Sequence, residues 1–135
     1  MKRIVPFKKI TNARTVKGAG RGKKLGIATV NFDPNAAAGL KAGIYVCKVI
    51  FDKPYWGVLH FGPRPVFGEK DQSLEVHLFD FKEGQEAKTA DIEVHMFIRA
   101  IKNFENAAQM LEVIKKDILI AKRHIKKLKR TELSH

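Results

Sequence analysis

The sequence has a single cysteine and no long apolar run. Because Cys47 has no second cysteine to pair with, the disulfide framework of small secreted domains is excluded, and a reducing cytoplasm is expected. No hydrophobic stretch approaches the ~20 residues of a membrane-spanning helix. The N-terminus also lacks the apolar core of a signal peptide, because Lys8 and Lys9 interrupt it. Membrane association is therefore not expected.

Acidic residues are missing from two stretches of the chain. Residues 1–32 contain nine Lys or Arg and no Asp or Glu, and residues 115–130 contain eight Lys or Arg against Asp117 alone. The formal net charge is +12 and the pI is near 10.0. This balance favours negatively charged partners, either phosphorylated small molecules or polyanions.

The hydrophobic pattern has a period of two over most of the chain. The 135 residues fit one domain, 1–135. Six or so short strands are expected in the first 100 residues. The alternation and the turn residues locate five of them, at 27–32, 43–51, 55–61, 73–81 and 91–98.

The pattern changes to a period of 3.6 near the C-terminus. An apolar stripe that starts at Phe104 predicts a long helix over about 103–130, with Asn103 as its N-cap. Short strands followed by one amphipathic helix indicate a mainly-β fold: an antiparallel barrel or sandwich over about 1–100, closed by the helix.

The segment "VKGAGRGKKLGIATVNF", residues 16–32, is rich in glycine and cations. It is not a P-loop, because Lys23 stands where the second glycine is required, and no G-x-G-x-x-G can be placed on it. Glycines still let backbone N–H groups approach an anion, and the cations supply charge. Composition leaves an anion-binding loop and a solvated turn both open. The residues concerned are Lys17, Gly18, Gly20, Arg21 and Gly22.

Two pairs of polar residues follow the alternation of a strand. Thr29 and Asn31 share one face of 27–32, and their neutral oxygens suit Mg²⁺, which takes its other ligands from water and substrate phosphates. Glu75 and His77 share a face of 73–81, where a carboxylate could accept a hydroxyl proton. The alternative for each pair is an ordinary solvated strand face.

Taken in order, four segments closely resemble the riboflavin kinase family. They are "VKGAGRGKKLGIATVNF", "HFGPRPVFG", "LEVHLFDF" and "FIRAIKNFENAAQMLEVIKKDILIAKRHI", which together run from about residue 13 to about 125. The resemblance implies a six-stranded antiparallel Greek-key barrel with a long C-terminal helix. It also implies a cytoplasmic, monomeric enzyme that uses ATP and Mg²⁺ to convert riboflavin into FMN, releasing ADP.

The same resemblance assigns roles to individual residues. Glu75 matches the family's catalytic base, Arg99 and Phe104 match its flavin-side positions, and Thr29 and Asn31 match the metal-binding pair of the P-T-A-N motif. The nucleotide-binding set is Lys17, Gly18, Gly20, Arg21, Gly22, Thr29 and Asn31.

Departures from the family pattern keep two alternatives open. Ala28 replaces the proline of P-T-A-N, and "FKEGQEAKTADIEV" replaces the usual tyrosine-glycine turn after the glutamate strand. These changes suit a relative that binds flavin or nucleotide without turnover. The positive charge suits a nucleic-acid-binding barrel, which is disfavoured because the sequence has no evident exposed aromatic platform. No nucleotidyltransferase domain is expected upstream, so FAD synthesis is not expected either.

Overall fold

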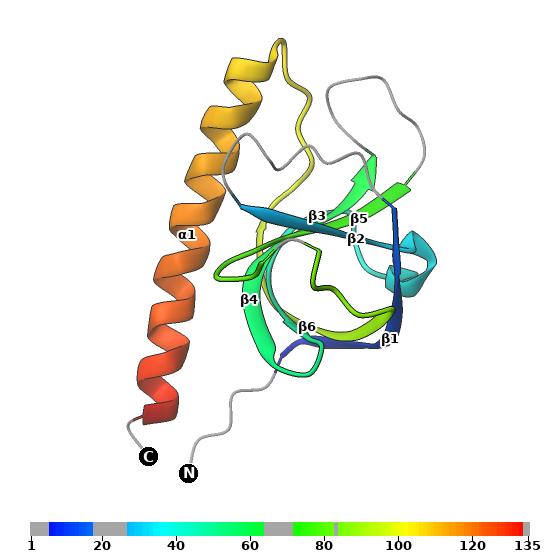
Figure 1. Cartoon of the computed structure of the whole chain (residues 1–135). Coiled ribbons are helices and arrows are strands. Elements are labelled where there is room, and N and C mark those ends of the chain that lie inside the picture. Colours follow the sequence, from blue (N-terminus) through cyan, green and yellow to red (C-terminus); the bar gives the residue numbers. More distant parts are fainter. Residues whose placement is uncertain (1–5, 18–26, 64–71, 83, 134–135) are drawn as a thin grey trace.

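The chain forms a closed barrel of antiparallel strands with one long helix along its outside (Figure 1). The computed structural model describes residues 6–17, 27–63, 72–82 and 84–133. Within these ranges no helix is long and apolar enough to cross a membrane. The elements are β1 (Lys8–Val16), β2 (Ala28–Phe32), the 3-10 helix η2 (Pro34–Ala37), β3 (Gly43–Ile50), β4 (Pro54–Pro63), β5 (Gln72–Leu78), β6 (Thr89–Arg99) and α1 (Ala107–Leu133).

The six strands follow the order β1-β2-β5-β4-β3-β6 around the barrel, and β6 closes on β1. The pairs β1–β2, β3–β4 and β4–β5 are neighbours in both sequence and space, whereas β2–β5, β3–β6 and β1–β6 join strands distant in sequence, so the connectivity is that of a Greek key. The expected six-stranded antiparallel barrel with a C-terminal helix is thereby confirmed. The strands predicted at 43–51 and 55–61 are β3 and β4, which pair antiparallel as a hairpin.

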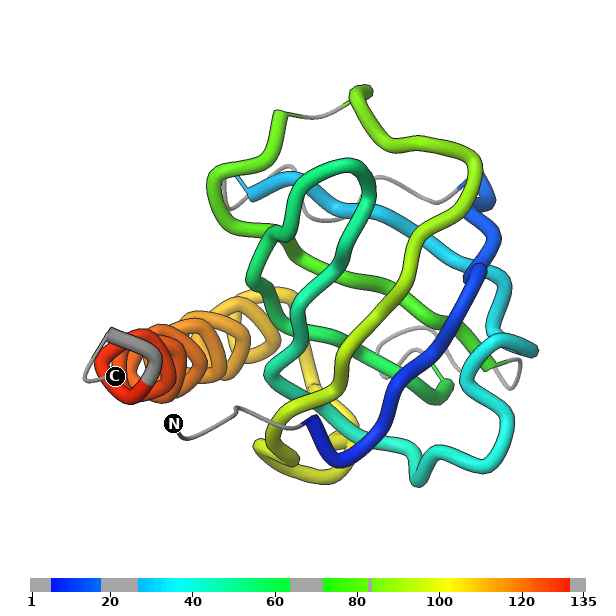
Figure 2. The backbone as a smooth tube through the Cα atoms, turned by 90° about the horizontal axis from the view of Figure 1, so that it is seen from below, coloured from blue at the N-terminus to red at the C-terminus, as the bar shows by residue number. Residues whose placement is uncertain are grey.

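Alternate residues of the strands fill the barrel with an apolar core. Phe32, Tyr45, Leu59, Leu74 and Ile92 are among its fully buried members. A second apolar cluster lies outside the barrel, where Ile118, Ala121 and Ile125 of α1 pack on β3 and β4. Figure 2 looks along the helix and shows it beside the ring of strands rather than across its opening. Outward-facing residues of β3 and β4, such as Ile44, Val46 and Val58, therefore meet α1.

Strand β1 was not located by the sequence pattern, and a bulge explains why. Its two core residues, Ile10 and Ala13, are three positions apart, which breaks the period of two. The register with β6 shifts between them, and Asn12 takes the left-handed conformation, with φ of 53°.

Two predicted boundaries were wrong. The helix starts at Ala107 rather than 103, because Asn106, not Asn103, caps it: the Oδ1 atom of Asn106 accepts the backbone N–H of Gln109 at 2.9 Å. Strand β5 ends at Leu78 rather than 81, because Asp80 adopts a φ of 59° and turns the chain.

Candidate active site

The antiparallel register brings the predicted polar pairs together on the outer face of the barrel. Asn31 of β2 lies directly opposite Glu75 of β5, and Thr29 lies opposite His77. Such cross-strand neighbours have Cβ atoms about 4.5–5.5 Å apart. Two residue pairs that are more than 40 positions apart in sequence thus form one cluster of four side chains.

His77 connects the two strands of this cluster. Its Nδ1 atom lies 3.2 Å from the Oγ1 atom of Thr29, and its Nε2 atom lies 3.6 Å from the Oε1 atom of Glu75. Burial lowers the pKa of His77, while the negative charges of Glu75 and then Asp117 act in the opposite direction. The net lowering favours the neutral ring at neutral pH, with one nitrogen as donor and the other as acceptor.

A glycine on the neighbouring strand allows this packing. A Cβ atom on Gly57 of β4 would lie 2.3 Å from the backbone oxygen of His77, a separation that real Cβ atoms do not adopt. Only glycine therefore lets β4 approach β5 this closely, and that approach fixes the position of His77.

Glu75 is a buried carboxylate with few partners. The residue is 9% exposed. Toward the other residues that the structure describes, its side chain makes one polar contact, 3.6 Å from Oε1 to the Nε2 atom of His77. The other Glu-Val-His triplet of the chain behaves differently: Glu93 and His95 of β6 form a hydrogen bond of 3.0 Å. Toward the described residues the carboxylate of Glu75 thus keeps lone pairs available, whereas Glu93 is engaged.

The same cluster contains oxygens that suit a magnesium ion accompanied by phosphates. The described residues include no group of three His, Cys, Asp or Glu side chains that could hold a metal ion by themselves. Thr29 and Asn31 offer neutral oxygens, and the side chain of Asn31 forms no hydrogen bond with another described residue. Two neutral oxygens fit Mg²⁺ that keeps waters and takes further ligands from a nucleotide.

Helix α1 adds a buried ion pair to this region. The Nε and Nη2 atoms of Arg99, at the end of β6, donate to both carboxylate oxygens of Asp117 at 2.9 and 2.8 Å. The side chains of Arg99 and Asp117 are 15% and 5% exposed. A third donor of Arg99 binds the backbone oxygen of Ala100 at 3.0 Å. The pair therefore holds the helix to the barrel.

Arg99 also shares a row of the sheet with the predicted base. Cross-strand partners lead from Asn31 through Glu75, His60 and Ile44 to Arg99.

The other predicted nucleotide and flavin residues are only partly described. Lys17 directly follows Val16, which is the partner of Asn31 on β1, so Lys17 lies at the same end of the barrel. Phe104 is half-buried in the segment between β6 and α1. Gly18, Gly20, Arg21 and Gly22 lie outside the described residues.

Sequence reasoning gave no role to His77 or Asp117. His77 was grouped with Glu75 on one strand face, but its bond to Thr29 depends on the β2–β5 register, which sequence does not give. Asp117 did leave a signal, because it is the single acid among eight cations in residues 115–130 and stands next to the buried Ile118.

Comparison with known proteins settles the family. The flavokinase (riboflavin kinase) family model matches residues 6–125, nearly the whole described chain. The chain belongs to the riboflavin kinase family. It is 36% identical over 116 residues to the trifunctional protein RibF/MnmA of Mycoplasmoides gallisepticum, a match that covers 84% of this chain and 17% of that protein. It is 30% identical over 131 residues to the riboflavin kinase of Mus musculus, covering 91% of this chain and 83% of that one.

A solved structure supports the architecture. The chain superimposes with a TM-score of 0.63 on a protein named as a macrolide-efflux protein from Streptococcus pneumoniae, at 24% identity. The match covers 83% of this chain and 37% of that one. It bears on the fold alone.

Proposed function

We propose that the protein is a riboflavin kinase, which transfers the γ-phosphoryl group of ATP to the 5′-hydroxyl of riboflavin and gives FMN and ADP. Family membership supports the reaction class. The observation that carries the proposal for this chain is the meeting of Thr29, Asn31 and Glu75 across β2 and β5. The test is whether the purified protein forms FMN from riboflavin when ATP and Mg²⁺ are supplied.

The mechanism uses Glu75 as the base. Its carboxylate accepts the proton of the 5′-hydroxyl as that oxygen bonds to the γ-phosphorus, while the bond from phosphorus to the bridging oxygen breaks and ADP leaves. The few polar contacts that Glu75 makes with described residues suit this role, because the carboxylate must have lone pairs available to the substrate hydroxyl.

Thr29 and Asn31 would hold the Mg²⁺ ion through their oxygens, and the ion would neutralise charge on the transferring phosphoryl group. Lys17 and the glycine-rich segment with Gly18, Gly20, Arg21 and Gly22 would cover the nucleotide phosphates, consistent with the position of Lys17 next to Val16 and its partner Asn31. Backbone N–H groups and cations at fixed positions stabilise such charge without reorganising.

Arg99 and Phe104 would lie on the flavin side of the site. The donors of Arg99 already bind Asp117 and Ala100, so its contribution to the flavin pocket would include holding α1 in place.

We also propose that the protein is a cytoplasmic monomer. The single cysteine, Cys47, is buried, and burial raises the pKa of its thiol, which suits a structural rather than a nucleophilic residue.

His77 acts in this scheme as a positioning residue. With Nε2–H turned to the Glu75 carboxylate, the Nδ1 atom accepts a hydrogen bond from the hydroxyl of Thr29. The lone pairs of the Thr29 oxygen then remain free for the metal ion. His77 thereby orients the Thr29 hydroxyl and limits the movement of Glu75 without touching the substrate.

His77→Leu is expected to raise the Mg²⁺ concentration at half-maximal rate, and to lower kcat, by about 10–100-fold, the usual effect of losing a group that orients a metal ligand. His77→Asn should retain most activity, because its amide oxygen can replace Nδ1 as the acceptor for Thr29. Steady-state rates over a Mg²⁺ titration measure both. Equal losses in the two variants with an unchanged Mg²⁺ dependence would show a merely structural role.

A further inference from the structure

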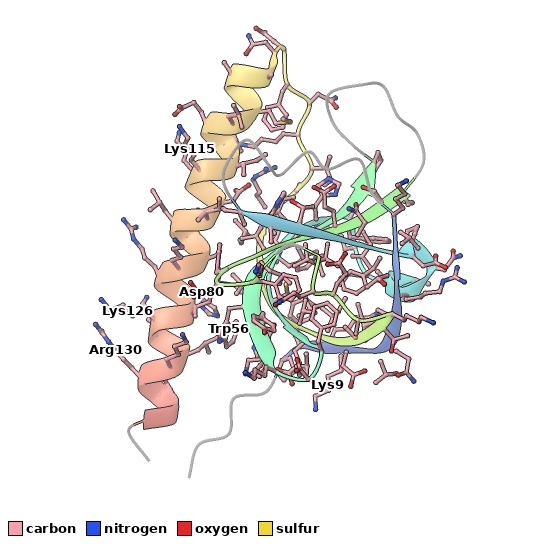
Figure 3. All side chains as sticks on the ribbon, viewed as in Figure 1. Lys9, Trp56, Asp80, Lys115, Lys126 and Arg130 are labelled. Atoms are coloured by element: carbon pink, nitrogen blue, oxygen red, sulfur yellow. The ribbon has the colours of Figure 1, made fainter. Side chains whose placement is uncertain are left out.

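A second concave site lies between the C-terminal half of α1 and the barrel. It is a groove of about 620 Å³, whose barrel side is formed by Tyr55 and Trp56 of β4 together with Phe79 and Asp80 after β5. Figure 3 shows Trp56 and Asp80 on the barrel side, facing the lower half of α1, where Lys126 and Arg130 lie. None of these residues belongs to the active-site cluster.

The helix side of the groove is strongly cationic. Its charged lining consists of Lys122, Lys126, Lys129 and Arg130, against Asp80 as the one acid. Among the residues that the structure describes, none of these four cations forms an ion pair. Lys122, Lys126 and Arg130 are four residues apart and thus about 6 Å apart along the axis. A row of available cations at this spacing suits the successive phosphates of an extended strand.

The barrel side of the groove carries aromatic rings beside these cations. The sequence pattern alone did not reveal them. Trp56 of β4 and Phe79 after β5 are both half-buried, and the β4–β5 pairing brings them together. The ring of Tyr55, on the opposite face of β4, packs instead against Phe51 and Phe81. The Nζ atom of Lys122 already lies over the ring of Phe79, 5.1 Å from its centre. Aromatic rings flanked by cations bind unstacked bases and phosphates together.

We propose that this groove binds single-stranded nucleic acid, with the helix cations on the phosphates and the aromatic wall against the bases. A duplex keeps its bases stacked inside and would leave the aromatic wall without a partner. A flat bilayer surface would not enter a concave groove. Ile125 lies eight residues, about 12 Å along the helix, beyond Asp117. The groove cations Lys126 and Lys129 lie further along the helix still, away from the active-site cluster.

The direct test uses a fluorescein-labelled 15-nucleotide oligouridine and the intrinsic fluorescence of Trp56. Because Trp56 is the only tryptophan, quenching of its emission reports occupancy of the groove. The test variant is Lys126→Glu/Lys129→Glu. The matched control is Lys115→Glu/Lys116→Glu, which makes the same charge change on the same helix. Lys115 is about 16 Å from Lys126 along the axis, beyond the Debye length of about 10 Å at 0.1 M salt.

The wild type and the control should bind the oligouridine with equal affinity and show the same quenching of Trp56 emission. The groove variant should bind it at least about tenfold more weakly at 0.1 M salt. With four phosphate contacts, the logarithm of the affinity should fall with that of the salt concentration with a slope of about −3 for the wild type. FMN formation by the groove variant should equal that of the wild type. This readout separates failure of the groove proposal from failure of the kinase proposal.

Three results would overturn the proposal. One is an equal loss of affinity in both charge-reversal variants, which would mean that only net charge attracts the oligonucleotide. Another is that inorganic polyphosphate carrying the same number of charges binds as tightly as oligouridine, which would exclude contacts to the bases. The third is groove-dependent binding to phosphatidylserine vesicles with no binding of oligouridine.

Discussion

Glu75→Gln is expected to lower kcat by about 10²–10⁴-fold, the usual contribution of a general base. Glutamine keeps the size of the side chain and its packing beside Asn31, but it cannot take the proton of the 5′-hydroxyl. The KM for riboflavin should change little, because the lost interaction acts in the transition state. Initial rates of FMN formation by chromatography measure both constants.

The chain provides its own control for this substitution. Glu93→Gln changes the same kind of residue in the second Glu-Val-His triplet, where the carboxylate is hydrogen-bonded to His95 at 3.0 Å. It lies on β6 and is not a cross-strand neighbour of Thr29 or Asn31. Near-wild-type kcat is expected for Glu93→Gln. A Glu75→Gln enzyme with undiminished kcat would show that another group takes the proton.

Arg99→Met is expected to destabilise the protein by about 3 kcal/mol, because it leaves the Asp117 carboxylate buried without its charge partner. Asp117 is 5% exposed, and Arg99 supplies bidentate bonds of 2.9 and 2.8 Å. Asp117→Leu alone should have a similar effect, since it leaves the guanidinium unpaired. Urea unfolding, followed by the far-UV signal of α1, gives the free energies.

The double variant Arg99→Met/Asp117→Leu should recover most of this loss, because replacing both partners of a buried pair by apolar groups is often nearly neutral. Arg14→Met is the control, because Arg14 forms a 2.9 Å pair with Asp33 but its side chain is 70% exposed. Its expected cost is below about 1 kcal/mol. Additive losses in the double variant would show that the two residues act independently.

The stable double variant also separates the two roles of Arg99. If Arg99 contacts the flavin, the double variant should be folded yet have a raised KM for riboflavin. If Arg99 only fixes α1, the KM should return to the wild-type value along with stability.

Alternation of outward and inward residues predicted five of the six strands and left a barrel or a sandwich open, and the resemblance to the riboflavin kinase family implied the six-stranded barrel. Strand β1 was missed where that rule fails, at the bulge between Ile10 and Ala13. The helix start was misplaced because Asn103 and Asn106 are both acceptable caps by residue type. Gln109 decides between them: its backbone N–H binds Asn106 and its side-chain oxygen accepts the N–H of Glu105 at 2.8 Å.

The polar pairs of the site were also predictable, but not their arrangement. Alternation placed Thr29 with Asn31 and Glu75 with His77, each on one strand. Their meeting depends on β2 pairing with β5, which is a contact between distant segments and leaves no local pattern. The same limit applies to Asp117, whose partner Arg99 is 18 residues away on another element.

The central claim is that this chain transfers a phosphoryl group to riboflavin, and the most direct test is to measure FMN and ADP in the same reaction. With riboflavin, ATP and Mg²⁺, the purified protein should form the two products in equal amounts. Formation of both products should stop when the metal is chelated. It should also be absent when riboflavin is replaced by a flavin that lacks the 5′-hydroxyl. Riboflavin that binds tightly, by quenching of its fluorescence, yet yields no FMN at any Mg²⁺ concentration would contradict the account.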